Sequence, residues 1–173
     1  MNAPIIPRAG VTELGVQLRQ AGRRVAFANG CFDVLHVGHV RYLEAAEQQG
    51  DILVVGVNSD RSVAALKGPG RPVLPAEARA ELVAALEPVD YVVVFDELTV
   101  EAILSELLPD VHCKGPDYTA KTVPEAALAK KLGVAVAIVG QAAAPPLFDT
   151  MVVLGQERVV RRLSKAAETL AAR

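Results

Sequence analysis

The sequence has few cysteines and no long apolar run, and each absence excludes a class of protein. Two cysteines, Cys31 and Cys113, are too few for a disulfide framework or a cysteine-rich metal centre, and they fit a reducing compartment. No apolar run approaches the roughly 20 residues that span a bilayer, and the N-terminus lacks a signal-peptide pattern. The sequence therefore predicts a cytoplasmic protein with no membrane partner.

Basic runs, repeats and low-complexity segments are also missing. With 18 basic and 20 acidic residues the formal net charge is −2, which argues against a nucleic-acid partner. About half of the 173 residues are apolar, so the chain is expected to form one globular domain, residues 1–173. Phosphate binding in such a chain must come from a few placed cations and helix ends.

Apolar runs alternate with segments of helical spacing, which predicts an α/β fold. We expect a Rossmann-like, doubly wound, five-stranded parallel sheet (residues 25–141) after an N-terminal lead-in (1–24). A divergent C-terminal helical tail, residues 142–173, follows the sheet. The expected strands are Val25–Ala28, Ile52–Val57, Asp90–Phe95, Asp110–Cys113 and Val134–Val139. The expected helices are Val11–Gln20, Val40–Glu47, Asp60–Leu66, Pro75–Leu86, Thr99–Leu108 and Pro124–Leu132, with Thr99 as an N-cap and Pro75 at the first helical position.

Two of the three histidines, His36 and His39, fall in one turn between the first strand and a helix. Asn29 and Gly30 are expected to break the strand before them. The start of a helix offers backbone N–H groups and a positive dipole end, both of which suit phosphate. Gly38 would let a ligand approach closely. The alternative is one capping and one packing histidine, but the pairing in one turn favours an anion site.

Further cations lie at other predicted loops and strand ends. Lys67 to Pro72 is a glycine- and proline-rich loop with two cations, either a solvated basic loop or an arm that reaches a triphosphate. Lys114 leaves a strand into the turn at Gly115. Asn58 lies at the carboxyl end of another strand, where ligands bind in open parallel sheets, although Ser59 or Asp60 could simply cap the next helix.

These residues resemble the cytidylyltransferase-like nucleotidyltransferases, and within them the adenylyltransferase domain of the ADP-heptose synthases. The resemblance spans about Val25 to Tyr118. It is carried by Asn29-Gly-Cys-Phe-Asp-x-x-His-x-Gly-His39, Arg41-Tyr-Leu-Glu44, Gly56-Val-Asn-Ser-Asp60, Lys67-Gly-Pro-Gly-Arg-Pro72 and Lys114-Gly-x-Asp-Tyr118.

The resemblance implies transfer of a nucleotidyl group from ATP to a sugar 1-phosphate, with Mg²⁺ carried by the nucleotide and no protein-built metal site. The implied catalytic residues are His36, His39 and Lys67. The implied nucleotide-binding residues are Asn29, Gly30, Cys31, Phe32, Gly38, Lys114, Gly115 and Thr150. The implied substrate-binding residues are Asp33, Asn58, Arg71, Arg79 and Asp117. Cys31 also fits a packing role, and Arg79 could instead pair with Glu77 or Glu81 on the surface.

Two departures from the family pattern keep alternatives open. Pro116 stands where the family has glycine, so one backbone N–H is lost. In the tail, only Thr150 survives of a Ser-Thr-Thr motif that holds phosphates in the family, and Asp149 takes the serine position. The alternatives are a cytidylyltransferase acting on glycerol phosphate or a related alcohol phosphate, and a nucleotide-binding pseudoenzyme or regulatory subunit. A homodimer is compatible with the sequence.

Overall fold

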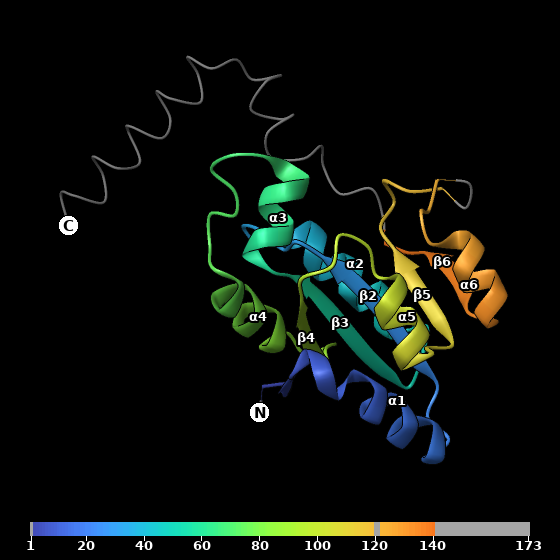
Figure 1. The fold of residues 1–173 in the computed structure, drawn as a ribbon. Coiled ribbons are helices and arrows are strands. Elements are labelled where there is room, and N and C mark those ends of the chain that lie inside the picture. The colour runs from blue at the N-terminus through green and yellow to red at the C-terminus, as the bar shows by residue number, and fades with distance from the viewer. Residues whose placement is uncertain (1, 120–121, 141–173) are drawn as a thin grey trace. The chain divides into compact units, whose positions relative to one another are not determined.

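The computed structural model describes residues 2–119 and 122–140, whose strands form one parallel sheet of order β1-β4-β3-β2-β5-β6 (Figure 1). Every paired neighbour in that sheet runs parallel. The strands are β1 (Ile5–Ile6), β2 (Val25–Gly30), β3 (Ile52–Asn58), β4 (Tyr91–Phe95), β5 (Val111–Lys114) and β6 (Ala135–Ile138). The predicted α/β class with a Rossmann-like parallel sheet is confirmed.

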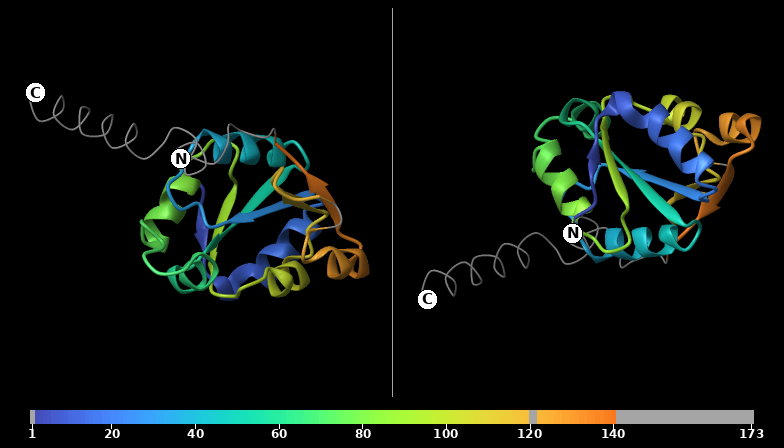
Figure 2. Two further views of the ribbon diagram at one scale, coloured as in Figure 1. Left: turned by 90° about the horizontal axis from the view of Figure 1, so that it is seen from above. Right: turned by 90° about the horizontal axis from the view of Figure 1, so that it is seen from below.

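Helices cover both faces of the sheet. They are α1 (Val11–Gln20), α2 (Val37–Glu47), α3 (Asp60–Lys67), α4 (Ala76–Ala84), α5 (Glu101–Leu107) and α6 (Ala126–Leu132), with a 3₁₀ turn at Arg8–Gly10. Figure 2 shows α2 on one side of the sheet and α1 and α5 on the other. Both faces of the central strands are therefore covered, as their unbroken apolar sequences predict.

Side chains of β2 alternate between two apolar clusters, one on each face. Ala26 and Ala28 join Leu43 of α2 in one cluster. Val25 and Phe27 join the cluster that contains Leu104 of α5. This period of two follows from the pleat of a strand, and it explains why β2 is apolar throughout.

The strand order reverses at β2, which places two carboxyl ends together. From β2 the chain moves to β3 and β4 on one side, and then returns to β5 and β6 on the other. Ala28 of β2 is in register with Cys113 of β5, so Asn29 and Lys114 follow at the same edge. Ligands of open α/β sheets bind outside the carboxyl ends at such a reversal.

Several predicted boundaries were wrong. The sheet has six strands, because Ile5–Ile6, expected to be loose, pairs with β4. Asn29 and Gly30 continue β2, since both are in register with β3. Thr99 does not cap α5, whose N-cap is Val100 without a side-chain hydrogen bond. Pro75 is the N-cap of α4 and not its first helical residue. Glu125, after Pro124, is the N-cap of α6.

Other predicted features agree or fall outside the described part of the chain. The predicted helix Val11–Gln20 coincides with α1. Ser59 caps α3, and its hydroxyl accepts the N–H of Ser62. In the ranges 2–119 and 122–140, we find no helix with the length and apolar character to cross a bilayer. The predicted C-terminal helix and Thr150 lie outside the described residues.

Candidate active site

The turn between β2 and α2 is built by its two histidines, which cap the helix reciprocally. We call residues 31–39 the histidine turn. His36 is the N-cap of α2, and its Nδ1 accepts the N–H of Gly38 at 3.1 Å. The Nδ1 of His39 accepts the N–H of His36 at 3.3 Å. Two backbone donors that a helix start leaves unpaired are thus satisfied by imidazole nitrogens.

This capping sets which ring nitrogens carry protons. Because both Nδ1 atoms accept hydrogen bonds, these bonds select the tautomer in which the ring proton lies on Nε2. Burial, followed by the nearby His36 and Lys67, lowers the pKa of His39 to about 4, in agreement with a neutral ring. The two rings lie against each other, tilted by 30°, with centroids 3.9 Å apart. The histidine turn therefore holds a pair of Nε2–H donors.

Two of the backbone N–H groups expected to bind phosphate at the start of α2 already form hydrogen bonds within the protein. The N–H of Gly38 is bonded to His36, and the N–H of His39 donates to the carbonyl of His36 at 2.9 Å. The imidazoles therefore take over the role expected of these two amides.

Within the histidine turn, the ring of Phe32 packs against the ring of His39. Its side chain is buried, and its ring meets the His39 ring edge-on with centroids 5.3 Å apart. A Cβ at Gly30 would lie 3.2 Å from the Phe32 ring, so glycine there lets the ring approach β2. Phe32 and Val34 both have positive φ, at 47° and 64°. Such backbone conformations cost energy and persist where the surrounding packing enforces them.

Asp33 connects the histidine turn to the loop that follows α3. We call residues 67–75 the Lys67 loop. The Asp33 carboxylate accepts from Nη1 of Arg71 at 2.7 Å and from the backbone N–H of Val73 at 2.8 Å. Burial alone would raise the pKa of Asp33, but these hydrogen bonds outweigh it and lower the pKa. Asp33 and Arg71, both predicted to bind substrate, bind each other here.

Arg79 of α4 is fully buried and joins three segments. Its guanidinium donates to the carbonyl of Leu74 at 2.9 Å, to the carbonyl of Cys31 at 2.5 Å and to the carboxylate of Asp60 at 2.8 Å. The alternative of a surface pair with Glu77 or Glu81 is wrong, because Arg79 has no exposed surface. Arg79 thus holds the Lys67 loop against the histidine turn.

Lys67 ends α3 with an exposed side chain close to the histidine turn. Its charge lowers the pKa values of His39 and Cys31, although burial outweighs it at Cys31 and raises the pKa of that thiol. The Cys31 thiol contacts the amide oxygen of Asn58 at 3.9 Å. Asn58 is itself buried and donates to the hydroxyl of Ser62 at 3.0 Å. The neutral thiol and Asn58 belong to the packed support of the site.

A polar cluster lies at the ends of β2 and β5, and we call it the lysine network: half-buried Asn29 with the buried His112, Lys114 and Glu125. The amide oxygen of Asn29 lies 3.1 Å from Nε2 of His112 and 3.1 Å from Nζ of Lys114. Lys114 also forms an ion pair of 3.3 Å with Glu125, the N-cap of α6. Burial and the charge of Lys114 lower the pKa of His112 to about 3. A neutral His112 thus donates to Asn29.

His112 and Glu125 are absent from the residues that the sequence predicts for the site. His112 could have been found, since residues two apart on a strand face the same side and Lys114 was predicted. No sequence signal pairs Glu125 with Lys114, because the contact depends on where α6 begins. Gly115 and Asp117 lie in the following turn, where the N–H of Tyr118 donates to the carbonyl of Gly115 at 3.1 Å, and Asp117 is exposed.

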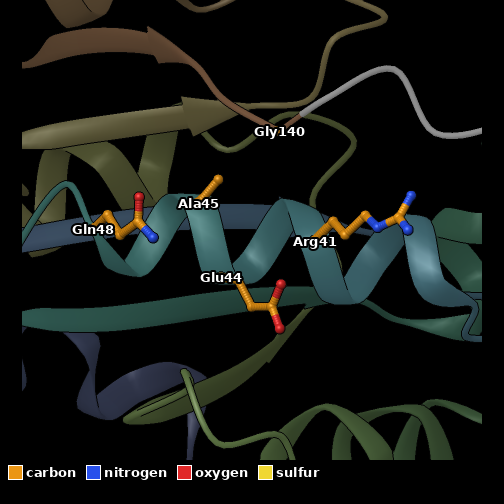
Figure 3. A pocket seen from close by; sticks show the side chains of 5 residues that line it. All are labelled: Arg41, Glu44, Ala45, Gln48 and Gly140. Carbon is orange, nitrogen blue, oxygen red and sulfur yellow. The ribbon is translucent and has the colours of Figure 1, made fainter.

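A cavity of about 480 Å³ lies elsewhere, beside α2 (Figure 3). It is lined by Arg41, Glu44, Ala45, Gln48 and Gly140, none of which is a predicted site residue. The histidine turn and the lysine network do not line it. Within residues 2–119 and 122–140 there is also no group of three or more histidine, cysteine or acidic side chains that could hold a metal ion.

Comparison with known proteins identifies the family. The family model described as cytidylyltransferase-like matches residues 27–155, which include the histidine turn and the lysine network. The chain belongs to the cytidylyltransferase-like family. This confirms the family resemblance that the sequence motifs indicate.

Relatives of this cytidylyltransferase-like chain include longer proteins. It is 53% identical over 121 residues to the bifunctional protein HldE of Methylobacillus flagellatus, covering 70% of this chain and 25% of that protein. It is 54% identical over 105 residues to HldE of Syntrophotalea carbinolica, covering 61% of this chain and 21% of that protein. The chain thus spans about a quarter of the length of these relatives.

One solved structure shares the fold. It is the lipopolysaccharide core biosynthesis protein of Thermoplasma volcanium GSS1, with a TM-score of 0.60 and 29% sequence identity. The match covers 70% of this chain and all of that one.

Proposed function

We propose that this chain transfers a nucleotidyl group from ATP to a sugar 1-phosphate, heptose 1-phosphate in the first instance, and releases pyrophosphate. An oxygen of the sugar phosphate attacks the α-phosphorus, a new P–O bond forms, and the bond to the β-phosphate oxygen breaks. Support comes from membership of the cytidylyltransferase-like family, similarity to HldE proteins, and a structural relative from lipopolysaccharide core biosynthesis.

The observation that carries the proposal is the pair of imidazoles whose Nδ1 atoms accept backbone hydrogen bonds, which leaves each Nε2–H to donate. In phosphoryl transfer the protein mainly positions the reactants and stabilises charge that develops on the phosphate oxygens. His36 and His39 would donate from Nε2 to these oxygens, aided by the positive end of the α2 dipole. Reciprocal capping would hold both rings in the donating tautomer before substrate arrives.

Cations on two sides would complete the site. Lys67, exposed beside His39, would neutralise the triphosphate, and Lys114 would do so from the end of β5. Mg²⁺ would enter as part of the nucleotide substrate. Asn29, Gly30 and Gly115 would border the nucleotide at the carboxyl edge of the sheet, and Asp117 would reach the sugar phosphate.

The main role of Asp33, Arg71 and Arg79 would be structural, because their hydrogen bonds join the histidine turn to the Lys67 loop. We call these two joined segments the frame. Through that frame they would place Lys67. The proposed pathway is the supply of activated sugar for lipopolysaccharide precursors in the cytoplasm. ATP and the sugar 1-phosphate are the proposed partners, without nucleic acid or membrane, and the chain can act as a monomer or a homodimer.

Turnover tests this proposal. The chain is incubated with Mg²⁺, one of ATP, CTP or GTP, and one of heptose 1-phosphate, other sugar 1-phosphates or glycerol phosphate, and pyrophosphate release is measured. The proposal expects release with ATP and heptose 1-phosphate. Release only with CTP and glycerol phosphate would establish a cytidylyltransferase instead, and nucleotide binding without any release would establish a pseudoenzyme.

A further inference from the structure

The ion pair of the lysine network is almost closed to solvent. The side chains of Lys114 and Glu125 are 6% and 5% exposed, and Nζ lies 3.3 Å from Oε2. Water screens such a pair weakly, so each charge strongly affects any third charge that approaches.

The pair is nevertheless incompletely bonded. Oε2 of Glu125 is buried and has no hydrogen-bond partner among the described residues, so the ammonium is close to it without a well-aligned N–H···O bond. Of the three donors of Lys114, one is directed to Asn29, and the ammonium lies 5.2 Å from the centre of the Tyr118 ring. A buried carboxylate oxygen without a hydrogen bond is costly, so this pair is held less firmly than a fully hydrogen-bonded one would be.

The position of Lys114 makes this pair relevant to ligand. It lies at the end of β5, beside β2, where the strand order reverses. A phosphate at that edge would meet the Lys114 ammonium and the Glu125 carboxylate together. The ammonium attracts phosphate and the carboxylate repels it, so both cannot stay in place when a triphosphate binds.

We infer that Glu125 is an internal counter-ion of Lys114, and that a nucleotide phosphate takes its place. This inference rests on the proposed function, in which Lys114 contacts the triphosphate. Glu125 is then a positioning residue that weakens nucleotide binding, because part of the binding free energy is spent on opening the pair. If the pair is closed in about nine of ten molecules, the apparent Kd is raised about tenfold.

The test is a calorimetric titration of the full chain with MgATP, repeated with MgCTP. Glu125→Gln keeps the shape of the side chain and removes its charge. We expect its Kd for the nucleotide to be about tenfold lower than that of the wild type. Lys114→Met should bind more weakly than the wild type. In the Lys114→Met background, Glu125→Gln should give a smaller gain, because only the direct repulsion between the carboxylate and the phosphate is then removed.

Glu101→Gln is the matched control, since it removes one exposed carboxylate from the first turn of α5 and should leave Kd unchanged. Glu125→Gln leaves Lys114 unpaired and is expected to melt at a lower temperature. Should it be unfolded at the assay temperature, Glu125→Asp withdraws the carboxylate by one methylene and should give a smaller gain of the same sign.

The outcomes separate this inference from the proposed function. If the wild type binds nucleotide and Glu125→Gln binds it equally or more weakly, Glu125 is not a competitor and the inference is overturned, while the proposed function stands. Binding by Glu125→Gln alone would support the inference. If neither protein binds ATP or CTP, both are overturned.

Discussion

The histidine turn and the lysine network lie at the same edge of the sheet but use their polar groups in opposite ways. The Nδ1 atoms of His36 and His39 accept hydrogen bonds from the backbone of the turn, and this leaves their Nε2–H groups to donate. Lys114 and Asn29, in contrast, are bonded to each other, and they also pair with Glu125 and His112 respectively. In the proposed function, the histidines are therefore free to donate to a ligand at once, whereas Lys114 must first leave its protein partners.

We expect the largest effect from His39→Ala, which removes one of the two imidazole donors. Loss of one preorganised donor typically lowers the rate about 10²–10³-fold. Stability should fall by only about 1 kcal/mol, the value of the lost capping bond. Pyrophosphate release and thermal melting measure the two effects. Glu47→Ala, exposed on the same helix, is the control. Normal turnover would show that His39 is not a donor to the reacting phosphate.

Arg79→Met should have its main effect on stability. It leaves the carbonyls of Leu74 and Cys31 and the carboxylate of Asp60 without their donor. We expect a loss of about 3 kcal/mol, or roughly 6–12 °C in melting temperature for a chain of this size. The control is Arg61→Met. It removes an ion pair in which the side chains of Arg61 and Asp96 are 79% and 59% exposed, so stability should change by less than about 0.5 kcal/mol. Equal shifts in the two variants would contradict the role of Arg79 in the frame.

The buried His112 predicts a pH dependence of stability. Its folded pKa of about 3 lies below its unfolded value of about 6.5. The unfolded chain therefore binds a proton that the folded chain does not, and stability is lost as the pH falls from 6.5 towards 3.

His112→Gln keeps a donor for Asn29 without titrating. Urea unfolding at pH 7 and pH 5 should show the wild type losing about 2 kcal/mol more than this variant. An identical loss in both proteins would mean that His112 is not the group responsible.

The smallest expected effect concerns Lys67→Met. The charge of Lys67 lowers the pKa of His39, so removing it should raise that pKa slightly, as measured by an NMR titration of the ring. Arg61→Met should leave the His39 titration in place. A fall in the pKa would show that Lys67 does not lie beside the histidine turn.

The sequence predicted those strands and helices whose own residues carry a clear apolar pattern. The apolar runs placed the central strands, and α1 was predicted residue for residue. The two-residue strand β1 was missed because Ile5–Ile6 is too short to show a period, and its pairing with β4 depends on residues 87 positions away along the chain. The prediction of a single domain over residues 1–173 is not tested by the described residues.

The site shows the same limit. The motif predicted His36, His39 and Lys114 as site residues. It did not predict which of their polar atoms would form hydrogen bonds or ion pairs within the protein. Burial of Arg79 and the pairing of Lys114 with Glu125 arise only when α4 and α6 pack on the sheet. These are tertiary contacts between distant segments, for which spacing in the sequence carries no signal.

The most direct test of the central claim is nitrogen-15 NMR of the histidine rings at pH 7, with and without MgATP. We predict that the ring proton of His36 and of His39 lies on Nε2 in the free chain, and that the Nε2 signals of both shift on addition of nucleotide while His112 changes less. A proton on Nδ1 of either ring, or Nε2 signals that do not respond to bound nucleotide, would contradict the account of the histidine turn as a pair of donors held ready for phosphate.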